Sequence, residues 1–274
     1  MESSLNREEK PKYQAISMTV GNGEVTALTL GDGPAIVLFH SLLADRSSFD
    51  LIAQPLSQTH KVVLLNLPGF GSSSKVGPDL AAVADRIAAA IKGFGLGAPP
   101  IFLGNGYGAF IAITLAVRHP GIASRLALTG CGATFSEPGR AAFRQMSVAA
   151  QRNGLGTVAD VAMRRLFSPE YQAKHPQIIA ERKKRFLAVD PQTFYQACEA
   201  LALLDLRSEL AELDLPVLVL VGEGDEATPP PMAQELVAGL PNARLHVLPG
   251  CAHVPQLQAP ALFLSAIKDF IESD

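Results

Sequence analysis

The sequence predicts an α/β protein built on a doubly wound, mostly parallel sheet. Short apolar runs rich in β-branched residues alternate with amphipathic stretches along the chain. Several of these runs are apolar at every position, as expected for strands that are covered on both faces. Strand–helix alternation favours right-handed crossovers between parallel strands. The 274 residues are 48% hydrophobic and 18% charged, so the chain can bury a substantial core.

The elements are predicted in chain order from their periodicity and turn residues. A hairpin comes first, because two strand-like runs flank Gly21-Asn22-Gly23. The eight predicted strands are Gln14–Val20, Glu24–Leu30, Ala35–His40, Lys61–Leu67, Pro100–Asn105, Arg125–Gly130, Val217–Asp225 and Ala243–Gly250. The helices predicted between and after them are Leu80–Ile91, Tyr107–Arg118 and Ala259–Ile271.

Residues 136–213 interrupt the alternation of strands and helices. This stretch has no convincing strand and is rich in Ala, Arg, Leu and Gln, with four prolines as punctuation. We therefore expect a set of short helices inserted into the sheet domain. The predicted organisation is a core domain of residues 1–135 and 214–274 with a helical cap of residues 136–213. The charged run Glu181–Arg185 is interpreted as a solvated helix face.

Composition argues against several classes of protein. The formal net charge is −3 without long charged runs, which disfavours a nucleic-acid partner because such partners need a basic face. The three cysteines are odd in number and far apart, which favours a reducing compartment over a disulfide framework. The N-terminal stretch lacks an apolar signal core, and no apolar run approaches the ~20 residues that span a bilayer. We expect a cytoplasmic protein that does not bind a membrane.

Polar groups follow four of the predicted strands. They belong to His40–Leu43, Gly104–Gly108, Gly222–Asp225 and Gly250–His253. In an open parallel sheet, ligands bind beyond the carboxyl ends of the strands, so these segments are expected to form one site. The sequence shows no paired His/Cys spacing of the kind that binds metals, so no metal is expected.

Five segments together resemble the α/β-hydrolase superfamily. They are LFHSLLADRSSFD, LNLPGFGSS, GNGYG, VLVGEGDEATPP and LPGCAHVPQLQAP, in that order along nearly the whole chain. Three cap segments, RRLFSPEYQAKHP, LAVDPQTFYQACEAL and DLRSEL, are most similar to the 3-oxoadipate enol-lactonase branch. The resemblance implies an α/β-hydrolase fold with an eight-stranded sheet and a helical cap. It also implies hydrolysis of a small-molecule ester or lactone without a cofactor.

The resemblance assigns roles to residues at the predicted site. In this family the catalytic residues follow the order Ser, Asp/Glu, His. Asp225 matches the acid and His253 the base, and the backbone N–H groups of Leu42 and Tyr107 match the oxyanion hole. The alternative for Asp225 is a helix cap. His40 is interpreted as a residue that holds its loop rather than as a catalytic base.

Gly106 stands where the family has its nucleophilic serine. The turn demands strained backbone angles, which glycine adopts at no steric cost. Three accounts remain open: an inactivated serine hydrolase, which we favour; a natural glycine protein in which His253 and Asp225 activate water; and a non-catalytic small-molecule binding protein. Cys131 and Cys251 are not expected to replace the serine, because neither occupies the turn.

The cap is expected to supply apolar side chains to a small pocket. The predicted pocket residues are His40, Ser41, Phe143, Met146, Phe167 and Phe194. Arginines in the cap could pair with a substrate carboxylate, and the candidates are Arg140, Arg144, Arg164 and Arg165. A carbon–carbon bond hydrolase is an alternative with the same triad, whereas a haloalkane- or epoxide-type enzyme would need an aspartate at position 106. The oligomeric state, including a homodimer, is left open.

Overall fold

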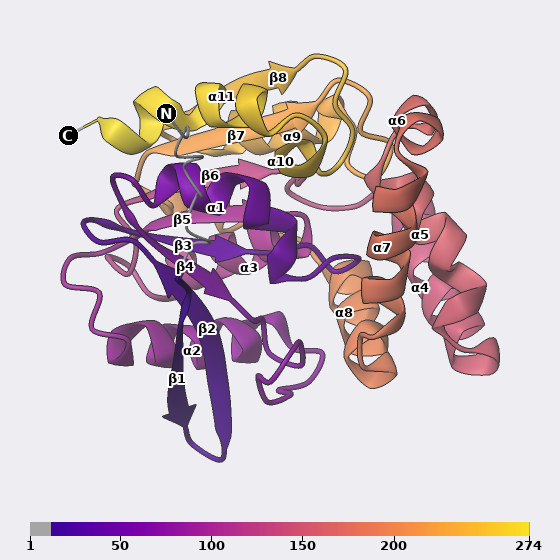
Figure 1. Ribbon diagram of the computed structural model, residues 1–274, viewed down its shortest axis with the longest axis horizontal. Coiled ribbons are helices and arrows are strands. Elements are labelled where there is room, and N and C mark those ends of the chain that lie inside the picture. Colours follow the sequence, from indigo (N-terminus) through magenta and orange to yellow (C-terminus); the bar gives the residue numbers. More distant parts are fainter. Residues whose placement is uncertain (1–11, 274) are drawn as a thin grey trace, which may run out of the picture.

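The computed structural model describes residues 12–273. Residues 1–11 and residue 274 lie outside the described residues. The prediction that the N-terminal stretch is not a signal peptide therefore concerns residues that are not described. Eight strands form one sheet in the order β1-β2-β4-β3-β5-β6-β7-β8 (Figure 1). The strands are β1 (Gln14–Val20), β2 (Gly23–Leu30), β3 (Ala35–Phe39), β4 (Lys61–Leu65), β5 (Ile101–Asn105), β6 (Arg125–Thr129), β7 (Val217–Gly222) and β8 (Ala243–Leu248).

The predicted mostly parallel, doubly wound sheet is confirmed. Strands β4, β3, β5, β6, β7 and β8 pair in parallel, and the β1–β2 hairpin joins β4 in antiparallel fashion. Most predicted strands extend one to three residues past the observed ends, because the polar residues there belong to the loops beyond the sheet. The parallel arrangement therefore places the ends of β3, β5, β7 and β8 at one edge.

Helices cover both faces of the sheet. α1 (Asp50–Leu56) and α11 (Pro260–Glu272) lie on one face, where Ile36 and Leu38 pack into the same cluster as Phe263. α2 (Leu80–Gly93), α3 (Tyr107–Arg118) and α9 (Pro230–Gly239) lie on the other, with Val37 and Phe39. The alternation along β3 explains why this strand is apolar throughout, since both of its faces are buried.

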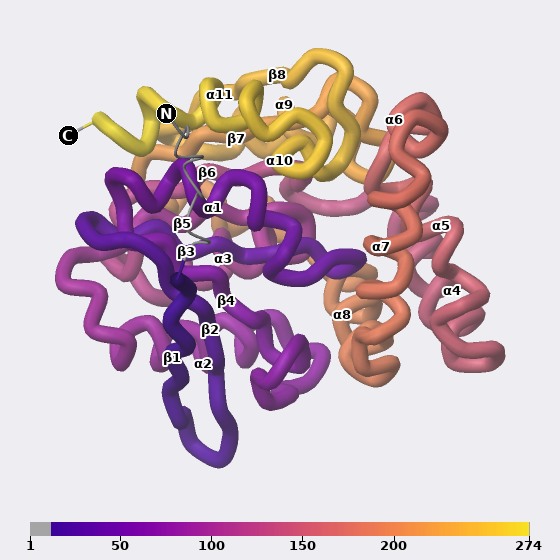
Figure 2. Tube along the Cα trace, in the orientation of Figure 1, coloured from indigo at the N-terminus to yellow at the C-terminus, as the bar shows by residue number. Residues whose placement is uncertain are grey.

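Residues 136–213 contain no strand and form helices gathered at one side of the molecule (Figure 2). These are α4 (Glu137–Asn153), α5 (Ala159–Leu166), α6 (Pro169–Lys174), α7 (Pro176–Leu187) and α8 (Pro191–Leu203), with the 3-10 turns η2 (Leu155–Val158) and η3 (Leu210–Glu212). The four prolines lie at the first or second position of their helices, where a missing N–H costs nothing. The division of the chain into core and cap domains stays a prediction.

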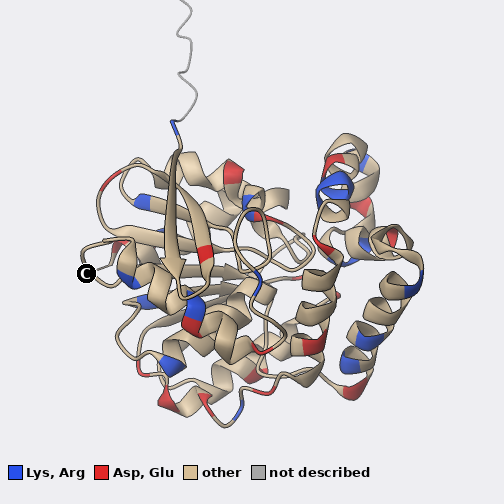
Figure 3. Cartoon of the chain, turned by 90° about the horizontal axis from the view of Figure 1, so that it is seen from below, with Lys and Arg blue, Asp and Glu red and all other residues tan. Residues whose placement is uncertain are grey.

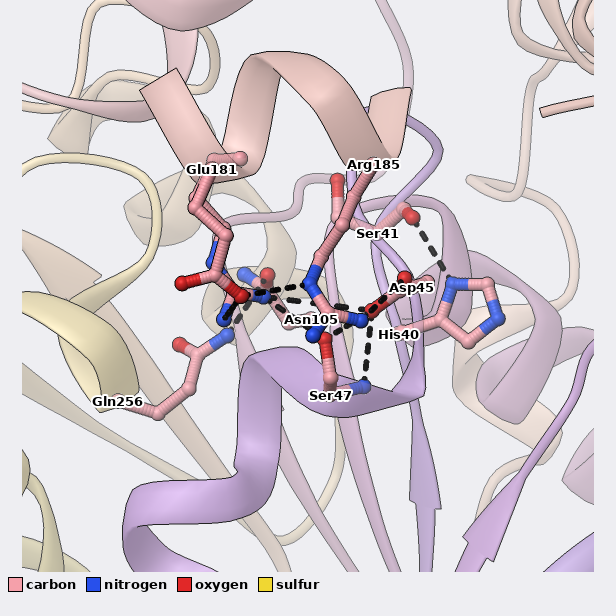
Figure 4. Close-up of polar contacts among 9 residues, drawn as sticks. His40, Ser41, Asp45, Ser47, Asn105, Glu181, Arg185 and Gln256 are labelled. Atoms are coloured by element: carbon pink, nitrogen blue, oxygen red, sulfur yellow. Dashed lines mark hydrogen bonds and ion pairs between the residues drawn. The ribbon is translucent and has the colours of Figure 1, made fainter. Parts of the chain in front are cut away.

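The interpretation of Glu181–Arg185 as a solvated face was wrong in part. The Arg182 side chain is only 11% exposed and donates to Ser47 Oγ at 2.9 Å. Arg185 Nη1 lies 3.4 Å from Asp45 Oδ2, while its Nε donates to Glu181 (Figure 4). Ser47 belongs to the 3-10 turn η1 (Arg46–Phe49) that follows β3. Two arginines therefore fasten α7 to the main body, although the Arg185 side chain is still 40% exposed and only Arg182 is withdrawn from solvent.

Charged side chains of both signs are interspersed over the elements visible in Figure 3. That distribution matches the small net charge of the sequence. Within residues 12–273, none of the helices combines the length and apolarity required to cross a bilayer.

Candidate active site

The turn between β5 and α3 has the strained geometry that its glycines predict. Gly106 has φ 53° and ψ −121°, a conformation that residues with a side chain rarely adopt. The flanking glycines allow close packing: a Cβ atom at Gly108 would lie 2.2 Å from the carbonyl oxygen of Phe39, and one at Gly104 would lie 2.6 Å from Ala109 Cα. The strand, the turn and the helix therefore pack so closely that no Cβ atom fits at Gly104 or Gly108.

His253 and Asp225 meet at this turn although 28 positions separate them. His253 Nδ1 lies 2.9 Å from Asp225 Oδ2, and both side chains are buried. Nδ1 therefore carries the proton of the neutral ring, which leaves the lone pair on Nε2. Among the described residues Nε2 has no hydrogen-bond partner. The ring is thus oriented to accept a proton through Nε2.

Asp225 uses its two carboxylate oxygens for different purposes. Oδ1 accepts hydrogen bonds from the N–H groups of Ala227 (2.8 Å) and Thr228 (2.9 Å). Oδ2 accepts from Thr228 Oγ1 (2.8 Å) and from His253. Burial by itself raises the pKa of Asp225, but the nearby His253 ring and these hydrogen bonds outweigh burial and hold that pKa below its ordinary value. The carboxylate stays ionised while it closes a turn and orients the imidazole.

The free edge of the imidazole faces Gly106. A Cβ atom at position 106 would lie 2.8 Å from His253 Nε2, 2.7 Å from Ser41 Oγ and 3.2 Å from Ser41 Cβ. These distances are shorter than ordinary van der Waals contacts. The space that a serine side chain would use is therefore bounded by the base on one side and by the Ser41 side chain on the other.

Two residues with unpaired backbone N–H groups line one cavity beside Gly106. Leu42 lies in the turn after β3 and Tyr107 is the first residue of α3, where helix N–H groups have no intrahelical acceptor. Within residues 12–273 neither N–H donates to another group, and both residues line the cavity described below. Two such donors can accept the charge of an oxyanion.

Several residues that position the site were missed in the sequence. Asn105 Nδ2 donates to the carbonyl oxygen of His253 at 2.9 Å. Gln256 Nε2 donates to Asn105 Oδ1 at 3.1 Å (Figure 4). A Cβ atom at Gly130 would lie 2.8 Å from His253 Cε1, so this glycine makes room for the ring. Thr228 had a usable signal, since Asp-x-x-Thr is typical of a side-chain-capped turn. Asn105 and Gln256 had none, because their contact depends on the tertiary fold.

His40 is a buried structural residue in this arrangement. Its Nδ1 donates to the carbonyl oxygen of Ser41 at 3.0 Å (Figure 4). Its Nε2 accepts from the N–H of Leu67 at 3.4 Å. Burial lowers the pKa of His40 to about 4, so the ring is neutral at pH 7. Both ring nitrogens are occupied, which matches the interpretation that His40 holds its loop.

A cavity of about 30 Å³ lies beside Gly106. Its walls are Ser41, Leu42, Leu43, Gly106, Tyr107, Phe110, Gly130, Phe135, Phe143, Arg165, Leu201, Ala227, Thr228 and His253. A space of this size holds one or two water molecules. Binding of an ester therefore requires side chains of the wall to move.

The predicted pocket residues divide into two groups. Ser41 and Phe143 line this cavity. His40, Met146, Phe167 and Phe194, whose place in a substrate pocket stays a prediction, are buried and do not line it. The reason is packing among helices: Phe194 lies against Phe186 with ring centroids 5.5 Å apart, and Phe167 stacks on Tyr171. Aromatic residues of an inserted helix can face its neighbours as readily as the pocket.

The four candidate arginines also differ in their surroundings. Arg140 donates to three carbonyl oxygens and to Thr134 Oγ1, and Arg144 pairs with Glu137, so both have structural partners. Arg164 is exposed. Arg165 lines the cavity, lies over the Phe143 ring at 5.4 Å, and has no hydrogen-bond or ion-pair partner within residues 12–273. Among the four, only Arg165 lines the cavity beside Gly106.

The remaining candidates lie outside the cavity. Cys131 and Cys251 are buried thiols that do not line it, and burial raises the pKa of each. Within the described range of the chain, no cluster of three or more His, Cys, Asp or Glu residues could hold a metal ion.

Comparisons with known proteins agree with this geometry. Residues 36–266 match the model of the "Alpha/beta hydrolase family". A pimeloyl-[acyl-carrier protein] methyl ester esterase of Neisseria meningitidis is 31% identical over 86% of this chain and 92% of its own length. Among solved structures, the enol-lactonase of Burkholderia xenovorans superposes with a TM-score of 0.85 at 26% identity, over 93% of this chain and 99% of that one. A thermophilic esterase of Thermogutta terrifontis, at 24% identity, has the same fold with a TM-score of 0.84 over 95% and 98% of the chains.

Proposed function

The chain belongs to the alpha/beta hydrolase family, and we propose that it hydrolyses a carboxylic ester or lactone with His253 as general base and Asp225 as its orienting acid. One observation carries the proposal. Nε2 of the oriented His253 ring has no hydrogen-bond partner within residues 12–273 and lies 2.8 Å from the position that a Cβ atom at residue 106 would occupy. An oriented imidazole beside two free backbone donors is the arrangement that acyl transfer requires. Gly106 excludes only the covalent step at residue 106.

The relatives support an ester as the substrate class. They include a methyl ester esterase and an enol-lactonase, and esters and lactones share a carbonyl carbon bonded to oxygen. In the proposed site the carbonyl oxygen is held by the N–H groups of Leu42 and Tyr107. The hydroxyl group that attacks the carbonyl carbon then loses its proton to His253. Asp225 stabilises the resulting imidazolium.

Hydrolysis of p-nitrophenyl esters and small lactones by the purified chain tests this proposal. His253→Ala should lower kcat/KM by about 10²–10⁴, the usual contribution of a positioned general base. His246→Ala is the matched control, because that histidine is exposed on β8, and its activity should equal that of the parent. Equal turnover by the parent and His253→Ala would contradict the proposal.

A second candidate is a serine hydrolase inactivated at its nucleophile. The turn favours it, because Gly104, Asn105, Tyr107 and Gly108 surround Gly106 in the backbone geometry that positions a nucleophile. Gly106→Ser separates the two. A burst of acyl-enzyme and a gain of at least about 10³ over an inactive parent would support inactivation. If the parent already hydrolyses the ester and this activity is lost in His253→Ala, the main proposal is supported.

A further inference from the structure

The Ser41 hydroxyl borders the cavity beside Gly106 and makes no hydrogen bond within residues 12–273. Ser41 follows β3 and is buried, with 2% of its surface exposed, yet it lines the cavity shared by Gly106 and His253. Its carbonyl oxygen is occupied by His40 (Figure 4). Within residues 12–273 its Oγ has no hydrogen-bond partner. A buried hydroxyl is normally satisfied by protein or water, so this one is available to a ligand or a solvent molecule.

Gly106 allows Ser41 to approach His253. Ser41 Oγ and His253 Nε2 lie 2.7 Å and 2.8 Å from the same point, which a Cβ atom at position 106 would occupy. With glycine there, no Cβ atom fills the space that both groups border, and no hydrogen bond joins Ser41 Oγ to His253 Nε2 within residues 12–273. With any larger residue, the side chain would stand between them or push Ser41 aside. A nucleophile at residue 106 and a nucleophile at residue 41 are therefore mutually exclusive.

The oxyanion donors fit either position. In the serine hydrolases that this chain resembles, one donor is the N–H of the residue after the nucleophile. Tyr107 has that relation to residue 106, and Leu42 has the same relation to Ser41. Both residues line the cavity, and neither N–H donates to another group within residues 12–273. A carbonyl held by them lies beside Ser41 as well as above Gly106.

We propose that Ser41 supplies the nucleophile that Gly106 cannot. This inference rests on the proposed ester hydrolysis and identifies the attacking group. Ser41 Oγ forms a bond to the carbonyl carbon and its proton passes to His253 Nε2, while the C=O electron pair moves to the oxygen held by Leu42 and Tyr107. Collapse breaks the bond to the leaving alcohol, which takes the proton from His253 and leaves an acyl-Ser41 ester. Water then attacks that ester, gives its proton to His253, and the released Ser41 alkoxide recovers it.

Covalent trapping tests this inference. The parent, Ser41→Ala, Ser41→Cys and His253→Ala are treated with p-nitrophenyl acetate and with a fluorophosphonate, and the modified peptide is identified by mass spectrometry. We expect an adduct on Ser41 in the parent, its loss in His253→Ala, and an acyl-thioester in Ser41→Cys. Hydrolysis by Ser41→Ala should fall by at least about 10². Ser48→Ala is the matched control: Ser48 is also buried with an unpartnered hydroxyl, but it does not line the cavity.

The outcomes separate this inference from the function on which it rests. If Ser41→Ala hydrolyses the ester as fast as the parent and no adduct forms, while turnover still requires His253, water is the nucleophile and the inference is wrong. If no variant shows His253-dependent hydrolysis, the proposed function fails as well. Thermal unfolding of each variant shows whether it is folded, and Ser41→Cys keeps the test valid should Ser41→Ala not fold.

Discussion

At the scale of single residues, hydrogen bonding separates the side chains of the site. Some use every polar atom to hold the fold, and others leave an atom free for the proposed reaction. Asp225 closes its own turn through Oδ1 and holds His253 through Oδ2. His40 uses both ring nitrogens for support and has none left for chemistry. Two buried histidines therefore differ in their proposed roles because of their partners, which residue type alone does not reveal.

The buried neutral state of His40 predicts a pH dependence of stability. The pKa of His40 is about 4 in the folded chain and about 6.5 for an unperturbed histidine. Between these values the unfolded chain binds more protons, so this contribution is fully present above pH 6.5 and is lost as pH falls toward 4. The expected loss is up to about 3 kcal/mol. Urea denaturation at pH 7 and pH 4.5 measures it.

His40→Gln provides the comparison. The variant should be less stable than the parent at pH 7, by about 1–2 kcal/mol, because buried hydrogen bonds are lost. Its free energy of unfolding should nevertheless depend less on pH, since no imidazole is left to protonate. Parallel pH profiles for the two proteins would show that His40 titrates normally in the folded state.

At the scale of elements, the β5–α3 turn is positioned by close backbone packing against the end of β3. Gly108 lies where a Cβ atom would overlap the Phe39 carbonyl group, at 2.2 Å from its oxygen and 2.4 Å from its carbon. Backbone atoms cannot rotate away as side chains can. The same contact brings Gly106, Tyr107 and Ser41 together, so the geometry of the site and the packing of three elements have one cause.

Gly108→Ala should therefore destabilise the fold by at least about 2–3 kcal/mol, the cost of overpacking a rigid core. Gly156→Ala is the control, because nothing lies within 4 Å of a Cβ atom there, and a change within about 0.5 kcal/mol is expected. Urea denaturation followed by circular dichroism measures both. Gly108→Ala with the stability of the parent would mean that the elements are packed less tightly than described.

At the scale of the whole molecule, the cavity exists only where the sheet meets the inserted helices. Its sheet side comes from loops after β3, β5, β6, β7 and β8, and its helical side includes Phe143 of α4, Arg165 of α5 and Leu201 of α8. The only charged side chain among these walls, within the described residues, is the guanidinium of Arg165; burial lowers its pKa somewhat. The Asp225 carboxylate opposes that shift, but Arg165 makes no ion pair within the described residues. A guanidinium without an ion-pair contact in such a place favours a substrate that brings a negative charge.

Arg165→Gln should raise the KM for esters with a carboxylate in the acyl part by about 10-fold or more, the effect of losing one charge-assisted hydrogen bond. The KM for uncharged esters of similar size should change little. Arg164→Gln is the control, since the neighbouring side chain is exposed on the same helix. If Arg165→Gln affects both kinds of ester equally, Arg165 shapes the cavity rather than recognising charge.

Much of this molecule could be predicted from local patterns. Apolar runs such as Ile36–Phe39 and turn glycines such as Gly106 report backbone conformation directly, because periodicity and permitted φ angles are local properties. The eight strands and the helices of residues 136–213 were predicted in this way, as were the segments that contribute Asp225 and His253. The α/β-hydrolase resemblance then placed those segments in one fold.

The sequence by itself determined the elements, their order and the absence of a side chain at position 106. Only the tertiary structure decided which side chains surround that glycine: Ser41 and His253 approach it, Arg165 faces the cavity, and Phe167 and Phe194 turn toward neighbouring helices. It also showed that Arg182 is buried against Ser47 and that Arg185, still partly exposed, reaches Asp45. The physical reason is that local pattern specifies backbone conformation, whereas contacts between residues far apart in the chain follow from how whole layers pack.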